Sequence, residues 1–110
     1  MGSGYLLEVG YTPTLDLLVI AICRDFFSRE NAIEEKKCMR RTLMEYEYLN
    51  RRISDAAKEV AGDAYIIYIK EIGENVGYAQ SAAEDVSEYT YKKVKKEVKI
   101  NIAKKLHLID

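Results

Sequence analysis

The residues with the clearest capacity for chemistry in this chain are lysines that cluster near the C-terminus. Segment 92–105 carries seven lysines and one glutamate, a formal charge of +6. Segment 1–91 carries ten basic and sixteen acidic residues, a charge of −6, and the whole 110-residue chain has a charge of −1. Because electrostatic fields act locally, within a screening length of about 10 Å, such a split indicates that the two segments favour different binding partners. The basic segment would attract a polyanion that the rest of the chain repels.

These lysines occur at spacings that place many of them on one side of a helix. An apolar stripe runs through 87–106, formed by Tyr91, Val94, Val98, Ile102 and Leu106. This periodicity predicts a helix that packs against a core. Four lysines are expected to point away from the stripe, namely Lys92, Lys93, Lys96 and Lys99. Ser87 is a good N-cap residue for this helix.

The first turn of the same helix adds hydroxyl groups to the positive charge. Tyr89 and Thr90 could reach phosphates or base edges from there, and the free N–H groups of a helix N-terminus also favour phosphate. Lysines farther along would neutralise further phosphates. The candidate DNA-contacting residues are Ser87, Glu88, Tyr89, Thr90, Tyr91, Lys92, Lys93, Lys95, Lys96 and Lys99.

The lysine cluster also has other interpretations. It could be a solvated helix face, although within 92–105 only Glu97 offers a compensating charge. It could bind an acidic surface on another protein. A third interpretation is that the basic segment is neutralised by the acidic half of its own chain.

No set of side chains in the sequence is suited to catalysis or metal binding. The single histidine, His107, lies between two leucines near the chain end and is expected to be partly buried. Cys23 and Cys38 lack CxxC spacing and are expected to be free thiols in a reducing cytoplasm. Neighbouring carboxylates lie in charged, solvent-like contexts where raised pKa values are not expected, at Glu34 and Glu35, Glu45 and Glu47, and Glu71 and Glu74. We expect a non-enzymatic protein without metal or cofactor.

The rest of the chain predicts helices that position this segment. A single proline and long stretches rich in Glu, Lys, Leu, Ile and Ala favour an all-α domain, a small bundle of four or five helices. We expect helices over 12–27, 31–61, 64–73, 78–85 and 87–106. Residues 1–11 are expected to be a leader or a disordered N-terminus, and 12–110 a single domain. Within it, 12–61 would supply core and dimerisation helices, and 63–106 a helix-turn-helix.

Two features of the N-terminal half suggest a homodimer. Apolar residues cover most of the helix that starts at Thr12 and Pro13, so it should be buried nearly all round, in a core or a subunit interface. The next helix has a heptad-like repeat formed by Met39, Tyr46, Ile53 and Val60, which is long enough for an antiparallel hairpin or a dimer. The apolar run 17–23 is too short to span a membrane.

The C-terminal region also resembles a known family. VSEYTYKKVKKEVKINIAKKLHLID is similar to the end of phage and prophage transcriptional regulators of the ArpU/RinA kind, which are related to the sigma-factor region 4 helix-turn-helix. The likeness covers roughly the last 45 residues. The segment 78–85 departs from the family because it lacks large aliphatic residues. The matching positions are Ser87, Thr90, Tyr91, Lys92, Lys95, Ile102, Ala103 and Leu106.

The resemblance and the lysines together lead to one functional expectation. We expect a cytoplasmic, homodimeric, DNA-binding transcriptional regulator of phage type that contacts duplex DNA with its final helix. A two-fold dimer would place two such helices about one DNA turn apart, roughly 34 Å. The alternative is a small helical adaptor whose basic helix docks on an acidic protein partner.

Overall fold

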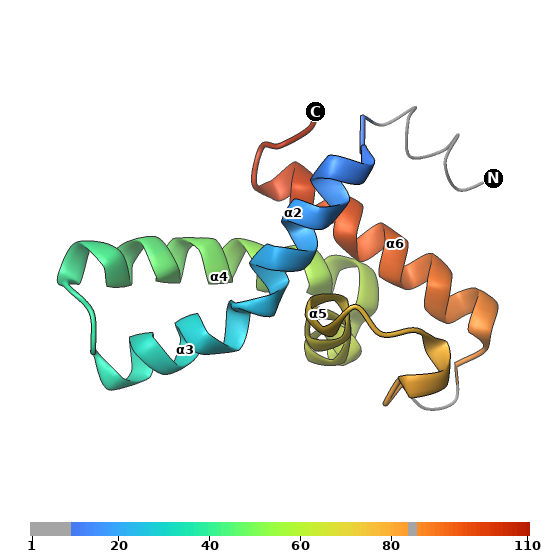
Figure 1. The fold of residues 1–110 in the computed structure, drawn as a ribbon, viewed down its shortest axis with the longest axis horizontal. Helices are drawn as coiled ribbons and strands as arrows, with labels where there is room; N and C mark the ends of the chain where they lie inside the picture. The colour runs from blue at the N-terminus through green and yellow to red at the C-terminus, as the bar shows by residue number, and fades with distance from the viewer. Residues whose placement is uncertain (1–9, 84–85) are drawn as a thin grey trace.

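The computed structural model describes residues 10–83 and 86–110, and the described chain is all-α (Figure 1). The expected small helical bundle is therefore confirmed. Two 3-10 turns, η1 and η2, connect some of its helices. The elements are α2 (Pro13–Arg24), α3 (Phe26–Glu35), α4 (Arg40–Ala61), η1 (Gly62–Ala64), α5 (Tyr65–Glu74), η2 (Tyr78–Gln80) and α6 (Glu88–Lys105).

The start of α2 follows the sequence prediction, although its end does not. The Thr12 hydroxyl oxygen accepts a hydrogen bond from the Leu15 N–H at 3.2 Å, and Pro13 occupies the first turn. Asp25, with φ −95° and ψ 6°, turns the chain, so the helix expected over 12–27 is divided between α2 and α3. The expected leader falls mostly on residues 1–9, which lie outside the described chain. Tyr11, which was assigned to the leader, is buried in the core.

The single helix expected over 31–61 is instead a hairpin of α3 and α4. Lys36 adopts a left-handed conformation with φ 54°, and the Lys37 N–H donates to the Ala32 carbonyl at 3.3 Å. Together these are typical of a helix C-cap that satisfies the last carbonyl groups. The break was not predicted because no glycine or proline marks it, and lysine rarely adopts this conformation.

A buried polar cluster holds the hairpin together at its base. The Arg29 side chain donates to the Asn50 side-chain oxygen at 2.6 Å and to the Ile22 carbonyl at 2.7 Å. The Asn50 amide donates to the Phe26 carbonyl at 3.0 Å and to the Glu30 carboxylate at 2.8 Å. Buried polar groups of this kind are tolerated because each finds a partner, and they set the register of α3 on α4.

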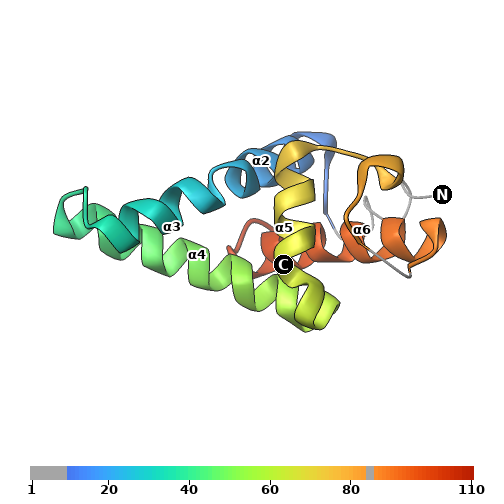
Figure 2. The same ribbon diagram turned by 90° about the horizontal axis from the view of Figure 1, so that it is seen from below.

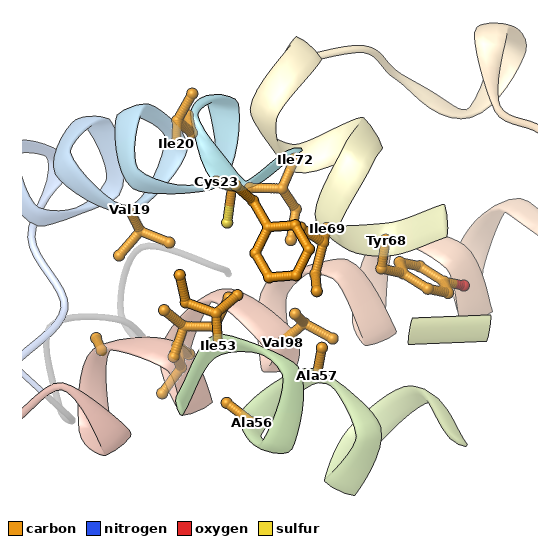
Figure 3. Packing of buried hydrophobic residues seen from close by; sticks show 14 of the residues in the cluster. Val19, Ile20, Cys23, Ile53, Ala56, Ala57, Tyr68, Ile69, Ile72 and Val98 are labelled. Atoms are coloured by element: carbon orange, nitrogen blue, oxygen red, sulfur yellow. The ribbon is translucent and has the colours of Figure 1, made fainter. Parts of the chain in front are cut away.

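The core lies at one end of α4, where α5 and α6 pack against it and α2 covers α5 (Figures 1 and 3). Its largest fully buried side chains are Tyr11, Tyr91, Ile53, Ile69, Ile72, Ile102, Val19, Val98 and Cys23. Toward the other end of α4, the α3–α4 hairpin projects from the rest of the molecule in both views (Figures 1 and 2). We call residues 30–49 the distal arm.

The crossing of α2 and α5 depends on a glycine. A Cβ atom added to Gly73 would lie 2.8 Å from both the Cα and the N of Arg24. Backbone atoms cannot yield as a flexible side chain can, so any larger residue would force the two helices apart. Glycine is therefore required by close packing at this position rather than by its backbone angles.

We predict that Gly73→Ala lowers the free energy of unfolding by about 1–3 kcal/mol, because overpacking moves α5 away from α2. Gly77→Ala is the matched control, since its added Cβ would meet only the Gln80 side chain at 3.7 Å. Urea unfolding followed by circular dichroism measures both variants. Equal stability of the two would contradict the close crossing.

Candidate nucleic-acid interface

The last helix, α6, forms where the sequence predicts it. The Ser87 hydroxyl oxygen accepts the Thr90 N–H at 3.1 Å, so the expected N-cap is present. The inward face of α6 is buried against the core through Tyr91, Val98, Ile100, Ile102 and Ala103. This anchoring leaves the N-terminal end of the helix at the surface, where Ser87, Glu88, Tyr89 and Thr90 are all exposed.

The segment before α6 differs from the predicted helix-turn-helix. The helix expected over 78–85 is present only as the single turn η2, and Ser81 is extended, with φ −75° and ψ 146°. Residues 84–85 lie outside the described chain. We call the described residues between α5 and α6, 75–83 and 86–87, the connector. Their only helical turn is η2, whereas the first helix of a helix-turn-helix is followed by a turn of three or four residues. The prediction of a helix over 78–85 is therefore wrong over 81–83.

One buried carboxylate explains why the connector is extended. Glu71, on α5 and only 4% exposed, accepts hydrogen bonds from the Ser81 hydroxyl at 2.7 Å and the Ala82 N–H at 2.6 Å. The Tyr91 hydroxyl of α6 donates to the same carboxylate at 2.9 Å. A backbone N–H that donates to Glu71 is not available to continue the helix from η2. The expectation that Glu71 lies in a solvent-like context is therefore wrong.

The ionised form of Glu71 is stabilised despite its burial. Burial alone would raise the pKa of this carboxyl group, but its three hydrogen-bond donors and the nearby positive charge of Lys95 outweigh burial and hold the pKa below its ordinary value. The sequence did contain a sign that Glu71 is buried, because Glu71 follows Tyr68 by three residues and therefore lies on the same, buried face of α5.

Six of the seven lysines of α6 fall into two groups. Three of them turn onto the body of the protein: Lys95 donates to the Val76 carbonyl, Lys99 pairs with Asp16, and Lys105 pairs with Glu59. The Lys99 ammonium lies 2.9 Å from the Asp16 carboxylate, and the Lys99 side chain is only 17% exposed. The prediction that Lys99 points away from the packed face is therefore wrong. Part of the basic segment is neutralised by its own chain, which was one of the interpretations left open.

The second group of lysines surrounds a shallow hollow on the outer face of α6. Its volume is about 320 Å³, and among the described residues it is lined by Tyr89, Lys92, Lys93, Lys96 and Glu97. The Tyr89 ring is 75% exposed. Lys92 pairs with Glu88 one turn earlier at 2.7 Å, so acidic groups moderate the charge on this face.

Tyr91 is not a member of this surface. Its side chain is 1% exposed, and its ring stacks on Tyr68 with centroids 5.5 Å apart. Burial, together with the hydrogen bond to Glu71, raises the pKa of Tyr91 to about 12. The assignment of Tyr91 and Lys99 to a DNA-contacting surface is corrected, because packing and ion pairing inside the protein occupy both side chains. Lys95 is half-buried and is likewise directed onto the connector.

The thiol of Cys23 is buried in the core, in an environment that suppresses its reactivity. Burial raises the pKa of the Cys23 thiol to about 12. Within residues 10–83 and 86–110, no group of three or more His, Cys, Asp or Glu side chains could hold a metal ion. The helices in that part of the chain are all too short or too polar to cross a membrane.

Comparison with known proteins identifies no relative of this chain. Neither the protein-family models, nor the curated proteins, nor the solved structures include a significant match to this chain. The candidate interface is therefore defined by the structure alone. It consists of Ser87, Glu88, Tyr89 and Thr90 at the exposed start of the helix, and of Lys92, Lys93 and Lys96 around the hollow.

The division of the lysines predicts unequal effects on stability. Lys99→Met should lower the free energy of unfolding by about 1–2 kcal/mol, because it removes a charged hydrogen-bond partner from half-buried Asp16. Lys93→Met, on the exposed face of the same helix, should change it by less than about 0.5 kcal/mol. Chemical denaturation measures both. Equal losses would show that Lys99 is not anchored as described.

Because the pKa of Glu71 is lowered in the folded protein, we predict that the free energy of unfolding depends on pH. A carboxyl group whose pKa is lowered on folding stabilises the folded state above its unfolded value of 4.5, and this contribution disappears as the pH falls through the folded pKa. Glu71→Gln should cost about 1–3 kcal/mol near neutral pH and progressively less as the pH falls below 4.5. Denaturation curves over this pH range, with exposed Glu74→Gln as control, measure the difference. A pH-independent difference would contradict the role of the Glu71 charge.

Proposed function

We propose that this protein is a non-enzymatic, DNA-binding transcriptional regulator that contacts duplex DNA with the first turns of α6. The observation that carries the proposal is the hollow on the outer face of α6, where three lysines surround an exposed tyrosine. The phage-type assignment rests on the resemblance of the C-terminal residues. The exposed members of that resemblance, Ser87, Thr90 and Lys92, lie at the start of α6, and Lys92 lines the hollow.

The chemistry of this surface suits a nucleic-acid backbone. Each lysine ammonium can replace a counterion at a phosphate, which makes binding favourable and strongly dependent on salt. The Thr90 and Tyr89 hydroxyls can donate to phosphate oxygens, and the exposed Tyr89 ring offers an apolar face to a sugar or base. Because the inward side of α6 is fixed in the core, these groups are held on one rigid helix.

The proposed contact uses α6 without a preceding docking helix. In a helix-turn-helix, the first helix crosses the DNA backbone and orients the second. Here the connector takes that position, and the Tyr78 hydroxyl donates to the Val86 carbonyl at 2.7 Å next to the start of α6. We expect modest affinity and modest sequence specificity, since only one short stretch of helix reaches the DNA.

An acidic protein surface is the second candidate partner. It is favoured by two carboxylates near the outer lysines: Glu97 lines the hollow, and Glu88 pairs with Lys92. Both would repel phosphates but could pair with a lysine or arginine of a protein partner. An exposed tyrosine within a hollow is also typical of protein interfaces. The two candidates differ in whether a bare duplex is bound at low salt.

Fluorescence anisotropy with a duplex of about two helical turns, roughly 20 base pairs, tests the first candidate. Three lysine–phosphate contacts predict a slope of log K against log salt of about −2.7 per chain between about 50 and 200 mM. Replacing Lys93 and Lys96 with Gln should make the slope less steep by about two units.

The control variant replaces Lys58 and Lys70 with Gln, which removes the same charge from exposed lysines on α4 and α5. It should bind DNA as the unmodified chain does. Absence of binding at the lowest salt, or equal losses in the two variants, would overturn the DNA proposal.

A further inference from the structure

The distal arm contains no buried residue. All twenty residues from 30 to 49 are half-buried or exposed, and several of them are apolar. Met39 is 77% exposed and Met44 is 59% exposed. Helices of this length are marginal in water on their own, and most of their stability comes from packing an apolar face. The arm therefore presents an apolar face that the rest of the described chain leaves partly uncovered.

The uncovered face continues the stripe that builds the core. Along α4, the heptad-like repeat runs from Met39 through Tyr46 to Ile53. Ile53 is fully buried where α5 and α6 pack against α4 (Figure 3). Tyr46 lies nearer the start of α4 and is half-buried, and Met39 directly precedes that helix and is exposed. Of the described helices, only α3 accompanies this part of α4 (Figures 1 and 2). The apolar pattern is thus continuous, whereas its burial decreases toward the start of the helix.

The charges of the arm indicate what covers this face. Its first six residues, 30–35, carry three glutamates and no cation, and the next six, 36–41, carry four cations and no acid. A strongly acidic partner would be repelled by the first band and a strongly basic partner by the second. In a two-fold dimer each surface meets itself, so neighbouring bands of opposite sign can pair across the axis.

We propose that the distal arm is a homodimer interface, in which the α3–α4 hairpins of two copies pack as a four-helix bundle. The stripe of Met39, Leu43, Tyr46 and Leu49 forms its apolar centre. Met39 adds a flexible side chain that adapts to irregular packing, which is a common use of methionine at interfaces. The interface is independent of the DNA-contacting surface proposed above and does not require it.

Sedimentation equilibrium of the full chain without DNA tests this proposal. We expect a concentration-dependent rise from the 12.6-kDa mass of one chain to twice that mass. Replacing both Met39 and Tyr46 with Glu should raise the dissociation constant by about 100-fold or more, because four carboxylates would be desolvated at the centre of the bundle.

The matched control replaces Met44 and Tyr48 with Glu on another side of the same helix. These side chains are 59% and 52% exposed, and they lie about half a turn away from the stripe. The control should dimerise as the unmodified chain does, and thermal unfolding confirms that both variants are folded. A monomer at every concentration overturns the proposal, as does a dimer that the control substitutions break and the Met39 and Tyr46 substitutions leave intact.

Discussion

The arrangement of the C-terminal half depends on the buried carboxylate of Glu71. An ionised group removed from water is tolerated only when it is surrounded by donors, and this one draws its donors from two other parts of the chain. Ser81 and Ala82 come from the connector and Tyr91 from α6. By collecting these donors, one side chain on α5 fixes both the extended course of the connector and the position at which α6 begins.

The exposure of the lysines follows from that position. Once Tyr91 is held against Glu71 and Tyr68, the rotation of α6 about its own axis is set. Lys95 and Lys99 then face the body of the protein, where Lys95 donates to the Val76 carbonyl and Lys99 pairs with the Asp16 carboxylate. The lysines on the opposite side face outward around Tyr89. A single rotation thus separates the lysines that contact the body of the protein from those on the outer face of α6.

The two ends of α4 have different environments for a related reason. A chain of 110 residues can fill only a modest core, and here that core is built at the end of α4 that α5 and α6 reach. The other end is accompanied by α3 alone, with Arg29 and Asn50 fastening the hairpin where it meets the core. The same helix therefore serves as a core element and as the longer half of a projecting arm.

The sequence by itself determined the helical class, the caps at Thr12 and Ser87, and the extent of α6, because these depend on local propensity and periodicity. It did not reveal the break at Lys36, a left-handed residue that is not a glycine. Nor did it show that residues 81–83 are non-helical, that Glu71 is buried, or that Lys99 meets Asp16. Only the tertiary structure decided the last three, because they depend on polar groups that are distant in sequence and meet only when the chain is folded.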